Sequence, residues 1–423
     1  MLRTVLAAIV FLSFAVTTQA AGLPDANKWQ PKWLYFKDGY EGREDARRVA
    51  TWLDKEMLSS GWIQLDNEAL FGWKATNNNK WTATRGGGLT CKTGELGWLM
   101  TTTQWADFEL VVDYRCVDPD ANSGVFIRSA AVPTNPAEDC YEVNIAAQPH
   151  NFPTGSIADR KRGDYAEGEL DKLEAASDKF HRLHIIANGP HIEVLLDGRA
   201  LTNFRDTSDN PLLTGHIGLQ FNQGEVIFRR VLLKPLGEVP LFNGRDLAGW
   251  KTDQAQSAEI SVTDNGEMQI LGGKGQAESE GEYGDFVMQY ECKVNGDGAN
   301  SGVFFRSIPG DMMNGYECQI QNTYLDGNRA KPKDCGTGGI YRRVNARMVN
   351  AQDHEWFYTT LNANGPHIAA WVNGLQVTDW TDTREPDENP RKGLRTAPGT
   401  FCLQAHDPTT NLLFRNMRIA EQP

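Results

Sequence analysis

The chain has 423 residues, a formal net charge of −13 and no Lys/Arg-rich run. This charge argues against a nucleic-acid partner, because such binding requires a basic footprint. The length allows two or three domains, each large enough for a core of its own. The 41 glycines and 12 tryptophans are typical of a turn-rich β protein, in which most tryptophans pack in the core and some stack on sugars.

The N-terminal residues 1–20 are typical of a secretory signal peptide. Arg3 precedes an apolar run, and residues 18–20 form a small-residue cleavage site. The run is too short to span a bilayer, so we expect a secreted or periplasmic protein without a membrane span. Residues 21–58 form an N-terminal extension. Apolar residues share one helical face over 43–58, which predicts a short helix outside the repeat that packs on the first domain.

The rest of the chain contains the same domain twice. The nine residues from Ala121 return from Ala299 with eight identical residues, and residues 188–192 recur without change at 364–368. The matches come in the same order in both copies, and their spacing is far too long for a solenoid or a propeller blade. Each copy must therefore form its own core.

The two copies set the domain boundaries. We predict one domain over residues 59–236 and a second over 237–423, with a short Pro-flanked linker around residues 235–240. Within each copy, apolar residues alternate with polar ones, as in residues 107–116. Many short strands with Gly-rich turns and little helix indicate an all-β antiparallel sandwich.

Two hairpins are visible in the letters. Residues 191–196 are followed by Asp197-Gly198, and residues 367–372 are followed by Asn373-Gly374. Asn or Asp before Gly accepts the positive φ values that a tight hairpin turn requires.

Seven cysteines remain after the predicted cleavage, and none occupies a matching place in both copies. The odd number leaves at least one thiol free, with room for one or two disulfides in an oxidising compartment. No Cys/His cluster has zinc spacing, so no metal site is predicted.

Alternation sorts the repeated polar letters onto one sheet face. In the first copy these letters are Arg128, Glu142, Asn144 and Gln220. In the second copy they are Arg306, Glu317, Gln319 and Gln404, with His406 where the first copy has Asn222. One interpretation is a solvated outer face whose Arg–Glu pair is worth under about 1 kcal/mol. Polar residues occur at these positions in both copies, which favours a binding or catalytic face.

His406 would share this face with Glu317 and Arg306. An imidazole, a carboxylate and a guanidinium together can move a proton beside a polarised carbonyl. The loop from 321 to 339, which carries Asn322, is long for a hairpin and is typical of a functional lid.

The motifs taken in order resemble a known family. They are the Ala-Asn-Ser-Gly-Val-Phe strands, Tyr-Glu-x-(Asn/Gln)-Ile at 141 and 316, Thr-Gly-Gly-Ile-Tyr ending at Tyr341, and the closing Leu-Gln and Phe-Arg pairs. Together they are similar to the 3-keto-disaccharide hydrolase family, in two tandem copies over nearly all of residues 60–421. The resemblance implies a concanavalin A-like jelly-roll sandwich that cleaves glycosidic bonds of sugars oxidised at C3.

A 3-keto sugar needs one base, one acid and one group that polarises the ketone. We assign Glu317 and His406 as base and acid in either order, and Arg306 as the polarising group. Substrate binding is expected from two sets of residues, in the second copy Gln319, Gln404, Asn322 and Tyr341, and in the first copy Arg128, Glu142, Asn144 and Gln220.

Several alternatives stay open from the sequence. The first copy departs from the family at Asn222, so it either catalyses or only binds glycan. A tandem lectin-like glycan-binding protein without catalysis is the second hypothesis, since this fold serves binding as well as chemistry. The letters do not distinguish elimination from hydrolysis or name the sugar. No cofactor is expected, and no dense Asp/Asn loop demands the Ca²⁺ that is common in related sandwiches.

Overall fold

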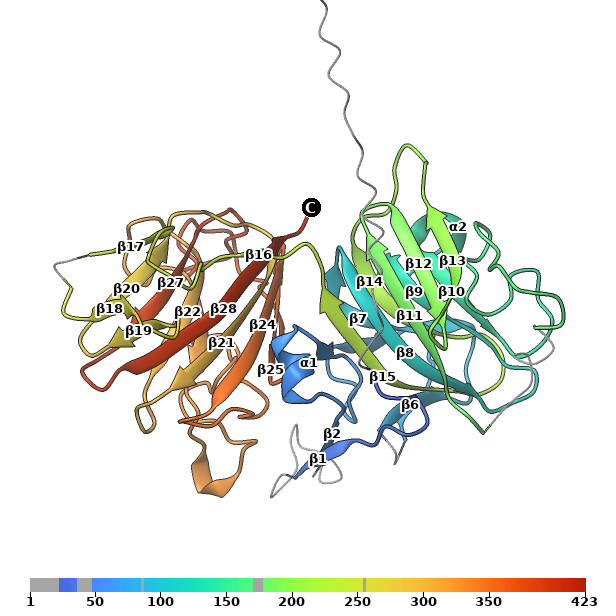
Figure 1. Cartoon of the computed structure of the whole chain (residues 1–423), viewed down its shortest axis with the longest axis horizontal. Coiled ribbons are helices and arrows are strands. Elements are labelled where there is room, and N and C mark those ends of the chain that lie inside the picture. Colours follow the sequence, from blue (N-terminus) through green and yellow to red (C-terminus); the bar gives the residue numbers. More distant parts are fainter. Residues whose placement is uncertain (1–22, 36–47, 85–86, 170–177, 254–255) are drawn as a thin grey trace, which may run out of the picture.

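The computed structural model shows two β-rich units side by side, with the N-terminal extension between them (Figure 1). The structure describes residues 23–35, 48–84, 87–169, 178–253 and 256–423. The predicted signal peptide, residues 1–20, lies outside these ranges.

The elements follow in chain order. The extension contains β1 (Lys32–Tyr35), β2 (Arg48–Thr51) and α1 (Lys55–Ser59). The first domain contains β3 (Ile63–Gln64), β4 (Trp73–Ala75), β5 (Trp81–Ala83), β6 (Gly88–Cys91), β7 (Gly97–Trp105), β8 (Phe108–Cys116), β9 (Asn122–Ser129), α2 (Pro136–Asp139), β10 (Tyr141–Ala146), β11 (His181–Asn188), β12 (His191–Leu196), β13 (Arg199–Arg205), β14 (Gly215–Phe221) and β15 (Val226–Pro235). The second domain contains β16 (Val239–Pro240), β17 (Trp250–Thr252), β18 (Glu259–Val262), β19 (Met268–Leu271), β20 (Gly275–Ser279), β21 (Phe286–Val294), β22 (Ser301–Ser307), β23 (Tyr316–Ile320), a 3-10 turn (Leu325–Gly327), β24 (Trp356–Asn364), β25 (His367–Val372), β26 (Leu375–Thr381), β27 (Thr400–Ala405) and β28 (Asn411–Glu421).

Each domain is a β-sandwich, as the alternation predicts. A five-stranded sheet in the order β10-β9-β14-β7-β4 forms one layer of the first domain, and β17-β20-β27-β22-β23 forms the same layer of the second. The opposite layers of both domains belong to one 16-stranded sheet, in which β3 lies between β15 and β26. The short strand β3 therefore joins the two large layers through backbone pairing.

Two separate apolar cores lie between these layers. The first is built on residues such as Phe108, Val125 and Leu219, and the second on Phe286, Val303 and Leu403, all of them fully buried. These sets hold equivalent places in the two copies. Trp105 and Trp371, whose rings lie 5.4 Å apart, connect the copies at their boundary.

Both predicted hairpins are confirmed. Strands β12 and β25 have the predicted bounds, and each ends at the Asp-Gly or Asn-Gly turn. Asp197 and Asn373 have φ values of 51° and 49°, and the glycines after them also have positive φ. Short polar residues tolerate this left-handed conformation, which is why the dipeptides predict the turns.

The predicted helix over residues 43–58 is wrong in extent. Residues 43–47 lie outside the described residues, 48–51 form the strand β2 antiparallel to β1, and the helix α1 begins only at Lys55. The reason is a set of competing partners for the backbone. Ala50 N donates to Glu68 at 2.6 Å and Gln64 Nε2 donates to the Ala50 carbonyl at 2.9 Å, which holds this stretch extended.

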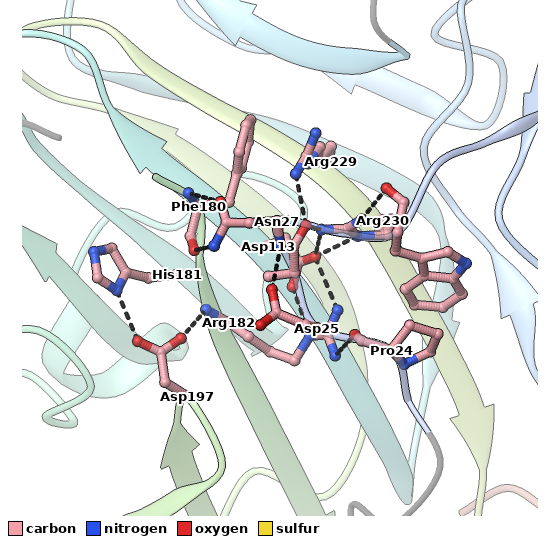
Figure 2. Close-up of polar contacts among 12 residues, drawn as sticks. Pro24, Asp25, Asn27, Asp113, Phe180, His181, Arg182, Asp197, Arg229 and Arg230 are labelled. Atoms are coloured by element: carbon pink, nitrogen blue, oxygen red, sulfur yellow. Dashed lines mark hydrogen bonds and ion pairs between the residues drawn. The ribbon is translucent and has the colours of Figure 1, made fainter. Parts of the chain in front are cut away.

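The beginning of the extension docks on the outer face of the first domain (Figure 2). Asp113, which is fully buried, pairs with Arg182 at 2.7 Å and also with Arg230. The two guanidinium groups then donate to backbone carbonyls of the extension, Arg182 to Pro24 at 2.8 Å and Arg230 to Ala26. A buried carboxylate thus orients two arginines that bind a peptide segment.

The second domain repeats this arrangement in a different form. Glu291 lies on β21 in the register that Asp113 occupies on β8, and it pairs with Arg415 at 2.8 Å. Ser59, at the end of α1, donates its hydroxyl to Glu291 at 2.9 Å, and the Ser59 carbonyl accepts from Arg418. The extension, together with Ser59 at the end of α1, therefore contacts equivalent outer-face sites of both domains, whereas the sequence predicted packing on the first domain.

All seven cysteines lie within the described residues, and each is a buried free thiol. Among the described residues, no helix is long and apolar enough to cross a membrane.

We predict that Asp113→Asn destabilises the chain by about 3–5 kcal/mol, because it leaves two arginines at a buried site without their counter-charge. Urea unfolding measures this change. Asp178→Asn is the matched control, since Asp178 is exposed and lies 3.9 Å from Arg115. A surface pair of that kind contributes about 0–1 kcal/mol. Equal effects of the two substitutions would contradict the buried cluster as an anchor.

Candidate active site

The five-stranded sheet of the second domain has one apolar face and one polar face. Its predicted polar residues come from β23 and β27, which lie on either side of β22. Phe304 on β22 pairs with Glu317 on β23 and with Cys402 on β27. By the two-residue period, Gln319 and Gln404 lie on the same face as Glu317. The structure therefore brings these three predicted side chains to one face, opposite the core.

Glu317 is the central ionisable group of this face. Its residue is only 5% exposed, and Arg391 Nη2 lies 3.1 Å from its Oε2. Desolvation by burial raises the pKa of Glu317 from 4.5 to about 7, while Arg391 and His406 lower it and Asp334 raises it. Both protonation states of this carboxyl are therefore available near neutral pH.

His406 follows the end of β27 and continues the register of Gln404. Its side chain is 44% exposed, and its Nδ1 lies 2.8 Å from Asp407 Oδ2. His406 is near enough to Glu317 to lower the pKa of that carboxyl. An accessible imidazole and a buried carboxyl thus share one side of the sheet, as the letters predict.

The two glutamines each have an amide oxygen without a partner. Gln319 Nε2 donates to Asn300 at 2.7 Å, and Gln404 Nε2 contacts Met313 Sδ at 3.2 Å. Their Oε1 atoms are buried and meet no hydrogen-bond donor within the part of the chain that the structure describes. A buried acceptor without a partner costs stability, so the two amides have hydrogen-bonding capacity that the described residues do not use.

Arg391 is a residue of this site that the sequence comparison misses. It donates to Glu317 and to the Met313 carbonyl, and its Cζ lies 5.1 Å from the Phe304 ring and 5.5 Å from the Tyr341 ring. The segment 383–398 that carries it is longer than its counterpart in the first copy. A search for repeated letters cannot find a residue on such an insertion.

Arg306 is not on the polar face, and this prediction is wrong. Its side chain is fully buried, pairs with Asp285 at 2.7 Å and donates to the carbonyls of Gly284, Gly365 and Arg395. The physical reason is a break in alternation. Arg306 has φ 48°, and the register between β22 and β27 shifts between Phe304 and Ser307.

Arg128 is buried in the same way in the first copy. It has φ 49°, pairs with Asp107 at 2.7 Å and donates to the carbonyls of Ala106, Gly189 and Leu212. Its predicted place on the binding face is also wrong. These two arginines recur because they connect the layers of each sandwich.

The remaining two predicted residues of the second domain have different surroundings. Tyr341 is half-buried beside Arg391, and its backbone N–H donates to the Glu317 carbonyl at 2.9 Å, so it borders the site. Asn322 is buried, donates to Asp353 at 3.0 Å and accepts from Thr337 at 2.6 Å. Both ends of its amide are used in holding the loop, and it does not join the cluster.

The first copy keeps part of the constellation. The pKa of Glu142 is raised to about 7, because burial and nearby Asp159 raise it more than a hydrogen bond from Gln220 lowers it. Asn144 donates to the Phe152 carbonyl and lies 3.3 Å from His150 Nδ1. The structure therefore brings Glu142 and Gln220 together, without an arginine in the position of Arg391.

The face of the first copy is also more apolar. Trp98 pairs with Gln220 across β7 and β14, whereas Gln276 pairs with Gln404 in the second copy. Trp98 packs edge-on against Phe126 at 5.6 Å, in a buried cluster with Met100 and Cys140. Side chains of this size fill the surface that polar groups occupy in the second domain.

Within the described residues, no group of three or more His, Cys, Asp or Glu side chains could hold a metal ion.

We predict that the raised pKa of Glu317 makes stability depend on pH. The folded chain binds this proton more tightly than the unfolded chain, so its contribution is full below about pH 4.5 and is lost as the pH rises through 7. Between pH 5 and 8, the free energy of unfolding should fall by about 2–3 kcal/mol less in Glu317→Gln than in the native chain. Urea unfolding at both pH values tests this. An equal change in the free energy of unfolding in Glu317→Gln and the native chain would contradict this prediction. Glu282→Gln, at an exposed position, serves as the control.

Solved structures of similar fold each match about one domain. A protein from Parabacteroides distasonis described as a glycosyl hydrolase is 19% identical, with 44% of this chain and 94% of that chain covered and a TM-score of 0.37. A carbohydrate-binding module from Bacillus subtilis is 18% identical, with 38% and 95% covered and a TM-score of 0.28. The β-glucanase of Bacillus licheniformis is 17% identical, with 44% and 97% covered and a TM-score of 0.30. Among curated proteins, no relative matches the sequence.

One family model matches the chain twice, over residues 61–234 and 237–420. These two ranges contain the two five-stranded sheets and the polar face around Glu317. The chain therefore belongs to the family of the 3-keto-alpha-glucoside-1,2-lyase-like domain, of which it contains two tandem copies.

Proposed function

We propose that the second domain cleaves the glycosidic bond of 3-keto glycosides or 3-keto disaccharides by elimination. The observation that carries this proposal is the buried carboxyl of Glu317, with a pKa raised to about 7, beside Arg391 and on the same face as His406. A titratable pair of this kind on one face fits proton transfer in both directions. The family description as lyase-like favours elimination over direct hydrolysis.

The chemistry follows from the ketone. A carbonyl at C3 acidifies the hydrogen at C2, so a base removes that proton and the electron pair forms the C1–C2 double bond. The C1–O bond breaks, and the departing oxygen takes a proton from an acid. The products are an unsaturated 3-keto sugar and an alcohol or a second sugar. Addition of water across the double bond then yields the free 3-keto sugar, so the net result equals hydrolysis.

His406 is suited to the role of base. Its imidazole is half-exposed and reaches solvent, whereas Glu317 lies deeper in the site. Glu317 in its protonated form then serves as the acid for the leaving oxygen. After one turnover the imidazole carries the proton from C2 and Glu317 is ionised, and transfer of a proton between them, directly or through water, restores the site.

Arg391 takes the role first assigned to Arg306. Its guanidinium lies against Glu317, so a positive charge is present where negative charge develops on the substrate oxygen. The unpartnered amide oxygens of Gln319 and Gln404 accept hydrogen bonds from sugar hydroxyls. Tyr341, next to Arg391, offers a ring at the border of the site.

The first domain is assigned a supporting role. It has no counterpart of His406 or Arg391, and Trp98 and Met100 fill its polar face. Glycan contact through Glu142, Asn144 and Gln220 without cleavage is the most that this arrangement supports. We also propose that the chain acts after export, on the strength of the signal-like residues 1–20.

We predict turnover of a 3-keto disaccharide by residues 21–423, with none of the unoxidised sugar. In D₂O the product should acquire deuterium at C2, because elimination and hydration replace that hydrogen. Direct hydrolysis would leave C2 unlabelled. Product analysis by NMR distinguishes the two routes. Unlabelled product would refute the elimination mechanism, although it would still show that the chain is an enzyme.

The same assay places the site. His406→Gln and Glu317→Gln should each lower kcat by about 10²–10⁴-fold, the usual contribution of a general acid or base. Glu142→Gln is the matched control in the first copy and should leave kcat unchanged. If Glu142→Gln alone abolished turnover, the site would belong to the first domain. Absence of turnover together with saturable binding of plain glycans would favour the lectin hypothesis.

A further inference from the structure

Asp407 lies directly after His406, in a turn formed by residues 407–410. Its Oδ2 is 2.8 Å from His406 Nδ1. Its other oxygen, Oδ1, accepts from the Thr409 backbone N–H at 2.7 Å and from the Thr409 hydroxyl at 2.6 Å. The carboxylate is therefore fixed on one side by the turn and faces the imidazole with the other.

The turn itself is held by a second hydroxyl. Thr410 Oγ1 accepts from the backbone N–H groups of His406 and Asp407, at 3.1 and 3.2 Å. These bonds connect the two residues that follow β27 to the residue that precedes β28, so the turn is anchored between two strands of the sandwich. The position of Asp407 is thus set by backbone geometry rather than by the ion pair alone.

This arrangement defines which imidazole nitrogen is available. An ionised carboxylate at Nδ1 accepts a hydrogen bond, so Nδ1 carries the proton in the neutral ring and Nε2 keeps its lone pair. Hydrogen bonds from Thr409 and from His406 lower the pKa of Asp407 to about 2, which keeps it ionised. Within the described residues, the side-chain hydrogen bond of His406 is made through Nδ1 and none is made through Nε2, so Nε2 can accept a proton from a substrate.

We propose that Asp407 is a positioning residue for the reaction in the second domain, where it fixes the tautomer and orientation of His406. This inference rests on the proposed function and adds a residue to it. Asp407 touches no reacting atom and acts only through the imidazole. The first copy has Asn222 and Gln223 at the corresponding places, so the loss of the imidazole and the loss of the carboxylate go together there.

A surface ion pair of ordinary kind is the competing explanation. The chain offers a matched example, since His354 Nε2 lies 2.6 Å from Asp297 Oδ1 and both side chains are exposed. Asp297→Asn removes the same kind of contact outside the site. Comparison of the two Asp→Asn substitutions therefore separates a positioning role from a general effect of charge.

The test combines kinetics with NMR of imidazole nitrogens in the full mature chain. Asp407→Asn should lower kcat by about 10²–10⁴-fold with KM changed less than about threefold, as for the orienting carboxylate of a catalytic triad. It should also shift the tautomer equilibrium of the neutral His406 ring away from the Nδ1–H form. The NMR signals of His406 are assigned as those that disappear in His406→Gln. Asp297→Asn should change neither, and Asp407→Glu should restore part of kcat.

Two results would overturn the inference. One is an unchanged tautomer in Asp407→Asn, and the other is a shifted tautomer with unchanged kcat. The tautomer is measured by NMR in the absence of substrate, so this inference can be refuted independently of the proposed reaction. If the native chain did not turn over any 3-keto sugar while Asp407→Asn still shifted the tautomer, the proposed reaction would be refuted. The effect of Asp407 on the His406 tautomer would still be supported. Thr409→Val, which removes one of the bonds to Asp407, should give a smaller loss of kcat in the same direction.

Discussion

A buried arginine joins the two layers of each sandwich, and the rest of the domain is arranged around it. Arg306 has a left-handed backbone conformation, and its side chain points from the five-stranded sheet to Asp285 and to three backbone carbonyls. Arg128 makes the same contacts with Asp107 in the first copy. A guanidinium in this position must keep all its partners, because an unpaired buried charge costs several kcal/mol. The relative position of the layers, and with it the place of the polar face, follows from this pair.

The sequence predicts much of this arrangement, and its errors have a physical cause. The two-residue period places Glu317, Gln319 and Gln404 on one face, and the Asn-Gly and Asp-Gly dipeptides locate the hairpins. The same period fails at Arg306, since a residue with positive φ interrupts it. The sequence does not show that an arginine has a positive φ. An arginine in a structural ion pair also recurs in both copies, so recurrence does not distinguish it from a binding residue.

Other features depend on contacts between distant segments. The stretch before α1 has a helical pattern, yet Gln64 and Glu68 hold its backbone extended. Arg391 belongs to a segment that is longer in the second copy than in the first, so a comparison of the copies does not align it with any residue. The raised pKa of Glu317 follows from burial beneath neighbouring residues that a single strand pattern does not show. The alternation of residues within each strand therefore predicts which side chains share the polar face, and contacts between distant segments determine the electrostatics of that face.

The strand β3 has a consequence for how such tandem proteins arise. Its backbone pairs with β15 of the first domain, and Gln64 also meets Gly374 and Leu375 beside β26 of the second. The first residue of β26 is thereby paired with β3, and an unpaired sheet edge is a template for aggregation. A copy cut out at the linker would lose this pairing. The backbone pairing through β3 therefore makes the two copies parts of one sheet rather than independent modules.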